Sequence, residues 1–437
     1  MENLKIEFTD RPVSAWGGLR MMKEVINRSG ILDFLSHLCL PYPGSNRGYS
    51  PLLIIEAFWV SIWIGASRFI HADWLRYDKV LKTIFGWEEV PSQSTYSRFF
   101  HKFSWKRNTE VFVELQRWFF NQLGFDRLTI DFDSTVITRY GEQEGSKRGY
   151  NPNKPGRLSH HPLMAFSSKL RMVVNAWLRP GNTVATSNVE SFLEETFEIL
   201  KGKLVGLVRA DSGFFSEKVL KWFEKRKLNY IVAVKLYKTI KWEIRGVKNW
   251  LEIVPGIQLG EFTYRAIDWK KERRFVVVRR NVERRPKSPG KLLLLFEDEL
   301  PIWRYSVYVT NLDLSTDHIW NMYRDRADSE NRIKELKHDF GIENFCLKKF
   351  WATEAAYRFI MVAYNLMSLF RHVVLQKKTQ HTLNTLKFKC FAIGSWITIH
   401  SRQKVLKLSV SGKKRAWLEG LFSKAKDIRP PFVISNA

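Results

Sequence analysis

Acidic residues that could do chemistry occur in three separate segments of the sequence. Asp131 and Asp133 lie two residues apart in LTIDFDSTVIT, a strand-like segment in which alternate side chains point to the same side. Asp211 follows the apolar segment LVGLV, and Glu330 lies in a helix-like segment. A carboxylate buried in a strand is costly unless it is paired or binds a cation. These acids therefore require a partner, and the spacing in the first strand does not separate Asp131 from Asp133.

Carboxylates that converge from two strands and a helix have a clear chemical use. They can hold two divalent ions about 4 Å apart, which activate an attacking oxygen and stabilise the leaving oxygen in phosphoryl transfer. Oxygen ligands favour magnesium or manganese over zinc. Asp211 ends a strand, where open α/β sheets place their ligands. A plainer interpretation, that the segment RADSGF is a turn or a helix cap, stays open.

The segment YRDRADSENRIKELKHDF, residues 323–340, has the pattern of a helix that carries both charge and aromatic groups. At roughly 100° per residue, four of its side chains fall within an arc of about 60°: Tyr323, Arg326, Glu330 and Lys337. An apolar stripe borders this arc and predicts that Glu330 lies beside a buried seam; it consists of Ile319, Met322, Ile333 and Leu336. Four charged residues fall on the opposite side: Asp325, Asp328, Arg332 and Glu335. An ordinary amphipathic helix with ion pairs at i,i+4 spacing is the alternative.

The elements that must position these residues alternate between strands and helices after residue 126. Strand-like segments occur at 128–138, 170–178, 204–210 and 229–236, and helix-like segments at 188–200 and 216–227. This order predicts a sheet that is at least partly parallel, with helices on its faces. Between residues 240 and 312 the apolar period changes to two, which predicts an antiparallel insertion.

The insertion contains a strongly basic segment, KERRFVVVRRNVERRPKSPGK, at residues 271–291. Strands with this charge could lie along a phosphate backbone. They could equally form a solvated sheet edge that resists aggregation.

The regions before and after the α/β part have helical patterns. In the first, residues 14–125, the segment VPSQSTYSRFFHKF (90–103) predicts a short helix that suits a helix-turn-helix DNA reader, although such helices are common. We expect this helix to expose four polar side chains: Gln93, Tyr96, Arg98 and Lys102. Residues 350–437 are predicted to be helical again and end in a Lys-rich tail.

Composition narrows the function classes. The formal net charge of +27 indicates a polyanionic partner, with nucleic acid favoured over a membrane surface. The three cysteines, Cys39, Cys346 and Cys390, fit neither a disulfide framework nor a zinc clip. For His160 and His161 we favour a role in fixing the backbone or contacting DNA over metal binding. The most apolar run is short and carries an acid, and no signal-peptide pattern occurs, so we expect a soluble protein in a reducing cytosol. Neither a P-loop nor a nucleophile elbow is present.

Tyr323, Arg326, Glu330 and Lys337 match the Tyr-x2-Arg-x3-Glu-x6-Lys signature at all four positions. The chain thus resembles the DDE transposases of bacterial insertion sequences in the group with this signature. Looser elements agree and cover most of residues 126–371: DST at 133–135, YGEQEGSKRGYNPNKPGR at 140–157, RADSGF at 209–214 and TEAAYRFIMVAYNLMSLFR at 353–371.

The resemblance implies an α/β fold with a ribonuclease H-like catalytic core and an all-β insertion, flanked by helical N- and C-terminal regions. Five regions follow: a helical DNA-binding region (1–125), the first part of the core (126–239), the insertion (240–312), the second part of the core (313–371) and a basic helical region (372–437). It also implies that Asp133, Asp211 and Glu330 are the catalytic, metal-binding carboxylates, with Asp133 favoured over Asp131 by the Asp-Ser-Thr match. Tyr323, Arg326 and Lys337 would contact DNA near the cleaved end.

The implied reaction is metal-dependent cleavage at the transposon ends, in which a metal-activated water frees a 3′ hydroxyl. That hydroxyl then attacks target DNA, without ATP or a covalent protein intermediate. We expect two Mg²⁺ or Mn²⁺ ions, double-stranded DNA as partner, a homodimer in the synaptic complex, no membrane and a bacterial, nucleoid-associated location in the cytoplasm. Two alternatives stay open: a catalytically silent DNA-binding relic or regulator, and a metal-dependent nuclease without strand transfer.

Overall fold

The computed structural model describes residues 4–434 except 46, 126, 185–186, 282–302 and 378–380. The chain forms two compact units. The first holds residues 1–125, 138–146 and 334–435, and the second holds 126–137, 147–333 and 436–437. Residues 291–296, KLLLLF, form one of the strand-like segments predicted for the insertion, and they lie outside the described residues. The second half of the basic segment 271–291 lies outside them too. The five predicted regions stay a prediction.

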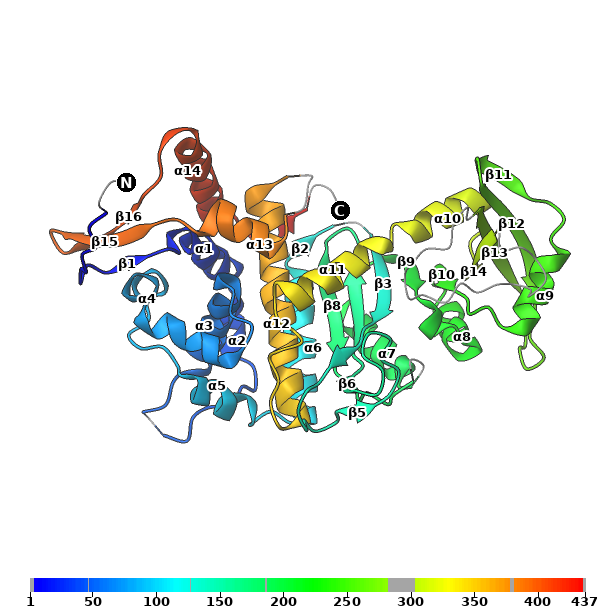
Figure 1. Cartoon of the computed structure of the whole chain (residues 1–437), viewed down its shortest axis with the longest axis horizontal. Coiled ribbons are helices and arrows are strands. Elements are labelled where there is room, and N and C mark those ends of the chain that lie inside the picture. The colour runs from blue at the N-terminus through cyan, green and yellow to red at the C-terminus, as the bar shows by residue number, and fades with distance from the viewer. Residues whose placement is uncertain are drawn as a thin grey trace. The chain divides into compact units, whose positions relative to one another are not determined.

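The second unit is built on a mixed sheet, which the described residues form with nine strands in the order β11-β12-β13-β14-β10-β9-β3-β7-β8 (Figure 1). The strands nearest the acidic residues are β3 (Leu128–Ser134), β7 (Leu163–Ser167), β8 (Met172–Trp177), β9 (Val205–Ala210) and β10 (Tyr230–Ala233). Strand β9 is parallel to both β3 and β10, whereas β7 is antiparallel to β3 and β8. The predicted strands and their partly parallel arrangement are confirmed.

Helices and short strands complete this part of the second unit. The predicted helices are α7 (Val189–Ile199) and α8 (Glu217–Lys225), and a short 3₁₀ turn, η3 (Ser212–Phe214), follows β9. The connector after the first strand forms β4 (Ile137–Thr138), β5 (Lys147–Arg148) and β6 (Leu158–His160).

The insertion extends the same sheet. Its strands are β11 (Leu251–Val254), β12 (Ile257–Tyr264), β13 (Arg273–Asn281) and β14 (Trp303–Thr310), and β14 pairs antiparallel with β10. The prediction of an all-β insertion is wrong at its start, because Lys238–Gly246 forms helix α9. An apolar face of the insertion strands packs against the helix that follows. The strands contribute Leu259, Val276 and Val278, and the helix contributes Ile319 and Trp320.

The segment that carries the four-residue signature is not one helix. Helix α10 (Thr316–Arg324) ends before Asp325, and α11 (Ala327–His338) begins after Arg326. The charged side opposite the signature residues is partly buried. Glu335 accepts a hydrogen bond from Arg371 and from the backbone of Leu383 within the first unit. A helical wheel cannot show this, since it does not include the elements that pack around the helix.

The first unit is mainly helical, as predicted. Its helices are α1 (Arg20–Ser29), α2 (Ile31–Ser36), α3 (Pro51–Ile64), α4 (Lys79–Phe85), α5 (Gln93–Phe100), α6 (Trp105–Asn121), α12 (Phe350–Phe370), α13 (Leu383–Leu386) and α14 (Gly412–Asp427), with 3₁₀ or π turns at Gly17–Leu19, Phe69–Tyr77, Arg371–Leu375 and Lys387–Phe391. Strand β2 (Leu123–Gly124) pairs with β17 (Phe432–Val433). Phe350–Leu375 is long and apolar enough to cross a membrane, but 89% of its most apolar window is buried, as in a core helix.

Two sequence predictions fail in this unit. The C-terminal region contains a hairpin, β15 (Ser395–His400) and β16 (Gln403–Leu408), which pairs with β1 (Val13–Ser14). Tyr96 of the predicted DNA-reading helix α5 is fully buried, although Arg98 is exposed. The Tyr96 ring packs near Phe58 and Phe69, so it contributes to the core rather than to a surface.

Candidate active site

Asp133 and Asp211 lie side by side at the carboxyl ends of two neighbouring strands. Strands β3 and β9 are parallel, and their register pairs Asp131 with Arg209 and Phe132 with Ala210. Asp133 directly follows Phe132, and Asp211 directly follows Ala210, so the two acids come next in this register. Asp133 is buried and accepts a hydrogen bond from the Ser134 backbone at 2.8 Å. Asp211 accepts one from the Gly213 backbone at 2.9 Å and so begins the turn η3.

The two carboxylates are electrostatically coupled. Burial and the neighbouring Asp133 raise the pKa of Asp211 to about 6, although Arg326 and the Gly213 hydrogen bond lower it. A raised pKa means that the ionised pair is unfavourable as it stands. A divalent cation would relieve this repulsion, and the donor atoms are the hard oxygens that Mg²⁺ and Mn²⁺ prefer. The Asp133–Asp211 pair therefore fits the metal implied by the sequence.

Asp131 has a different environment, although it lies on the same face of β3. Its two carboxylate oxygens accept hydrogen bonds from Arg209 at 2.6 and 2.8 Å. Arg209 also donates to Ser168 Oγ at 2.8 Å and to the Met322 carbonyl in α10. The Asp131–Arg209 ion pair is almost fully buried and joins the two strands to the helix. The structure thus distinguishes the two aspartates that strand geometry could not separate.

Arg326 attaches the start of α11 to the end of β3. Its guanidinium lies 2.9 Å from Asp133 Oδ2 and donates to the Phe132 carbonyl at 3.1 Å. Burial lowers the pKa of Arg326, but Asp133 and the other nearby acids outweigh burial and raise it above its ordinary value. The Ser329 hydroxyl, in the first turn of the helix, shares its proton between Asp133 Oδ2 at 3.2 Å and the Arg326 carbonyl at 2.8 Å. Both side chains hold the acid-bearing helix against the sheet.

Tyr323 makes the equivalent contact with β9. Its hydroxyl donates to the Ala210 carbonyl at 3.4 Å, next to Asp211, and its ring centroid lies 4.3 Å from that of Tyr308. Burial raises the pKa of the Tyr323 hydroxyl, so it stays protonated and can donate. Tyr323 and Arg326 thus fix the helix break at the two strand ends that carry Asp133 and Asp211.

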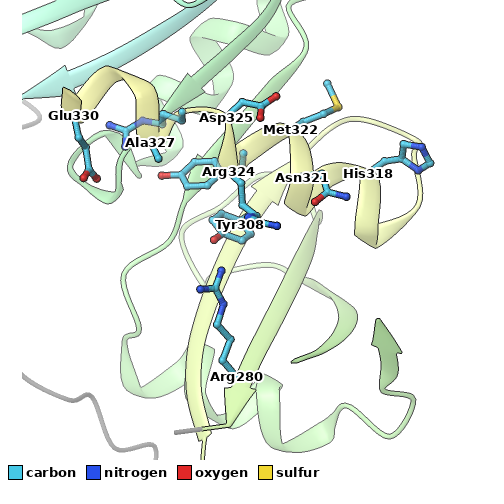
Figure 2. Close-up of a pocket in the computed structure, with 11 residues that line it drawn as sticks. Arg280, Tyr308, His318, Asn321, Met322, Arg324, Asp325, Ala327 and Glu330 are labelled. Carbon is cyan, nitrogen blue, oxygen red and sulfur yellow. The ribbon is translucent and has the colours of Figure 1, made fainter. Parts of the chain in front are cut away.

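Glu330 lies in the first turn of α11 and is exposed, with the buried residues Ser329 and Ile333 on either side. Its side chain lines a cavity of about 790 Å³ whose wall also includes Tyr308, Tyr323 and Arg326 (Figure 2). Across the described residues, no group of three or more His, Cys, Asp or Glu side chains could hold a metal. The structure therefore brings Asp133 and Asp211 together without placing Glu330 in a metal-binding group with them.

The other residues singled out in the sequence have partners of their own. Lys337 belongs to the first unit, where its ammonium forms an ion pair with Glu343 at 3.0 Å. His160 is fully buried, and His161 Nδ1 lies 3.3 Å from the Thr183 carbonyl, which agrees with a backbone-fixing role. The three cysteines are free.

Sequence reasoning missed two side chains that shape the site. Arg209 had a readable signal, because it stands two residues before Asp211, as Asp131 stands two residues before Asp133. Because β3 and β9 are parallel neighbours, Arg209 lies beside Asp131, and Asp211 lies beside Asp133. Ser329 had no such signal, since a serine within a helical segment carries no distinguishing pattern.

Comparisons with known proteins identify the family of this chain. The family model for transposase DDE domain group 1 matches residues 1–429. No curated protein matches the sequence. Among solved structures, the chain is similar to a piggyBac transposase in a synaptic complex with hairpin DNA, with 14% identity, 87% of this chain and 81% of that chain covered, and a TM-score of 0.45. The family match spans nearly the whole sequence, and the chain therefore belongs to the transposase DDE domain group 1 family.

Proposed function

We propose that this transposase cleaves DNA at the ends of an insertion sequence and joins the freed 3′ hydroxyl to target DNA. The observation that carries the proposal is the pair of coupled carboxylates, Asp133 and Asp211, at the ends of two parallel strands. The mixed core of β8, β7, β3, β9 and β10 supports the ribonuclease H-like fold that the resemblance implies.

In this proposal Asp133, Asp211 and Glu330 hold Mg²⁺ or Mn²⁺, with two ions in the working enzyme. Such ions supply Lewis-acid stabilisation of the attacking and leaving oxygens in phosphoryl transfer. The raised pKa of Asp211 supports a cation beside it, because a positive charge favours the ionised carboxylate. Glu330 has the exposure and the cavity that a third ligand and a DNA strand require.

In this scheme Tyr323, Arg326 and Lys337 contact the DNA near the cleaved end. Arg326 and Lys337 then exchange their ion pairs with Asp133 and Glu343 for contacts to phosphate. An arginine can grip a phosphate through two parallel hydrogen bonds, and a lysine supplies a point charge. In the first step a water oxygen attacks the scissile phosphorus, the bond from phosphorus to the 3′ oxygen breaks, and that oxygen takes up a proton. In the second step the same 3′ hydroxyl attacks a target phosphate and releases a target 3′ hydroxyl, so the number of phosphodiester bonds is conserved.

The net charge of +27 supports double-stranded DNA as the partner and a nucleoid-associated location in a bacterial cytoplasm. Two transposon ends must be held together for joining, so we propose a homodimer in the synaptic complex.

A cleavage and joining assay tests the function. The substrate is the DNA that flanks the gene, with magnesium, and the parent is compared with Glu330→Gln, which keeps the shape and removes the charge. We expect the parent to cut and join ends and the variant only to bind them. If both proteins merely bind, the chain is a DNA-binding relic or regulator, and if both cut equally, Glu330 is not a ligand.

Two further measurements separate the remaining alternatives. A substrate with a pre-cleaved 3′ hydroxyl is joined to target DNA by a transposase but not by a simple nuclease. The metal has its own readout, because MgCl₂ should raise the melting temperature of the parent and not that of Asp133→Asn. An equal rise in both proteins would remove Asp133 from the metal site.

A further inference from the structure

Two arginines outside the four-residue signature stand at the cavity that Glu330 lines. Arg280 comes from β13 of the insertion and Arg324 from the last turn of α10. Both are exposed, and in the part of the chain that the structure describes neither forms an ion pair. Arg326, which lines the same cavity, is already paired with Asp133. Arg280 and Arg324 therefore have guanidinium groups available for an anion.

A single aromatic ring positions both arginines. The guanidinium carbon of Arg324 lies 4.8 Å from the centroid of the Trp320 ring, and that of Arg280 lies 5.4 Å from it. Trp320 is itself buried in the apolar face between α10 and the insertion strands. Stacking on a fixed ring reduces the conformational freedom that an arginine must lose on binding, so the pair is partly pre-organised.

The charges of Arg280 and Arg324 both act on the Tyr308 hydroxyl. Burial raises the pKa of the Tyr308 hydroxyl, while Arg280 and Arg324 are among the charges that lower it. Figure 2 shows the Arg280 side chain extending toward Tyr308, with Arg324 on the other side of that ring. Tyr308 in turn packs against Tyr323, whose hydroxyl contacts the strand end beside Asp211. A connected set of side chains therefore leads from the acidic pair to the two arginines.

We propose that Arg280 and Arg324 form a phosphate clamp that holds the DNA backbone at the cavity, so that the insertion contributes directly to substrate binding. The inference rests on the proposed function, because it takes DNA as the substrate. Planar guanidinium groups recognise phosphate through paired N–H donors, which suits this role better than ammonium groups would. Arg304 on β14 is exposed and lies opposite Arg280 in the strand register. We expect it to add a weaker contact to the same DNA backbone.

The test uses the full chain and a mixed-sequence DNA duplex, with binding followed by fluorescence anisotropy over a series of salt concentrations. Each lost phosphate contact should lower the magnitude of the slope of log K against log salt by about 0.9. We expect Arg280→Gln and Arg324→Gln each to show this loss and to bind several-fold more weakly. Glutamine removes the charge and keeps a polar side chain at these exposed positions, which limits damage to the fold.

Arg226→Gln is the matched control. Arg226 also stacks on a tryptophan, Trp222, at 3.7 Å, but it lies at the end of α8, away from the cavity. The control should keep the parent slope. Equal slopes for the parent and both clamp variants, or an equal loss in the control, would overturn the clamp. If the parent cleaves DNA while the clamp variants bind and cleave as it does, the clamp fails and the proposed function stands. If the parent does not bind DNA at all, both fail.

Discussion

Two neighbouring positions on one face of the β3–β9 strand pair differ in the charges that they bring together. At the first, Asp131 faces Arg209, and opposite charges make two hydrogen bonds in a buried ion pair. At the next, Asp133 and Asp211 bring like charges together, and the pKa of Asp211 is raised. The first position holds the sheet to α10. At the second, Arg326 offsets part of the repulsion between the acids, and a bound cation would relieve more of it. Two carboxylates of one strand thus have different electrostatic environments because their neighbours at the end of β9 carry opposite charges.

The largest effect that would test this comparison is on stability. We expect Asp131→Asn to lower the free energy of unfolding by about 3–5 kcal/mol, because it leaves the Arg209 guanidinium buried without its counter-charge. Urea denaturation measures this loss. Asp133→Asn is the comparison. It also removes a buried counter-charge, that of Arg326, but it should cost less because it relieves the repulsion with Asp211 at the same time. Equal losses would mean that both positions are structural.

A smaller effect concerns pH. The folded-state pKa of Asp211, about 6, lies above the ordinary value of 3.8, so the folded protein binds a proton more tightly than the unfolded chain. Stability should therefore fall as the pH rises from about 4 to about 6, by about 2 kcal/mol. Asp211→Asn should remove this part of the pH dependence in denaturation curves without metal. An unchanged pH profile in the variant would show that the pKa of Asp211 is not raised in the folded protein.

The smallest effect concerns the hydrogen bond from Ser329 to Asp133. We expect Ser329→Ala to lower the free energy of unfolding by about 1 kcal/mol, because a hydrogen-bond donor to the buried Asp133 carboxylate is lost. Thermal denaturation measures this loss. Ser167→Ala is the control, because the buried Ser167 hydroxyl has no hydrogen-bond partner among the described residues. A loss as large in the control would assign the effect to packing.

The sequence predicted the strands that carry Asp133 and Asp211 because a strand core leaves a clear apolar pattern. It missed helix α9 and the β15–β16 hairpin. The hairpin did have a period-two signal, in SWITIH and QKVLKL on either side of Ser401 and Arg402, both of which adopt positive φ. The Lys-rich character of this region outweighed that signal. The prediction misses helix α9 because it places the start of the period-two pattern of the following strands at residue 240, inside the helix.

The sequence by itself determined which residue types could form the site: acids at two strand ends and an acid, an arginine and a tyrosine at fixed helical spacing. The tertiary structure decided their partners. It assigned Arg209 to Asp131, placed Asp211 beside Asp133, and broke the helix so that Tyr323 and Arg326 reach the two strand ends. The physical reason is that side-chain alternation fixes only the face on which a residue lies, whereas the charge of its cross-strand neighbour fixes what that residue can do.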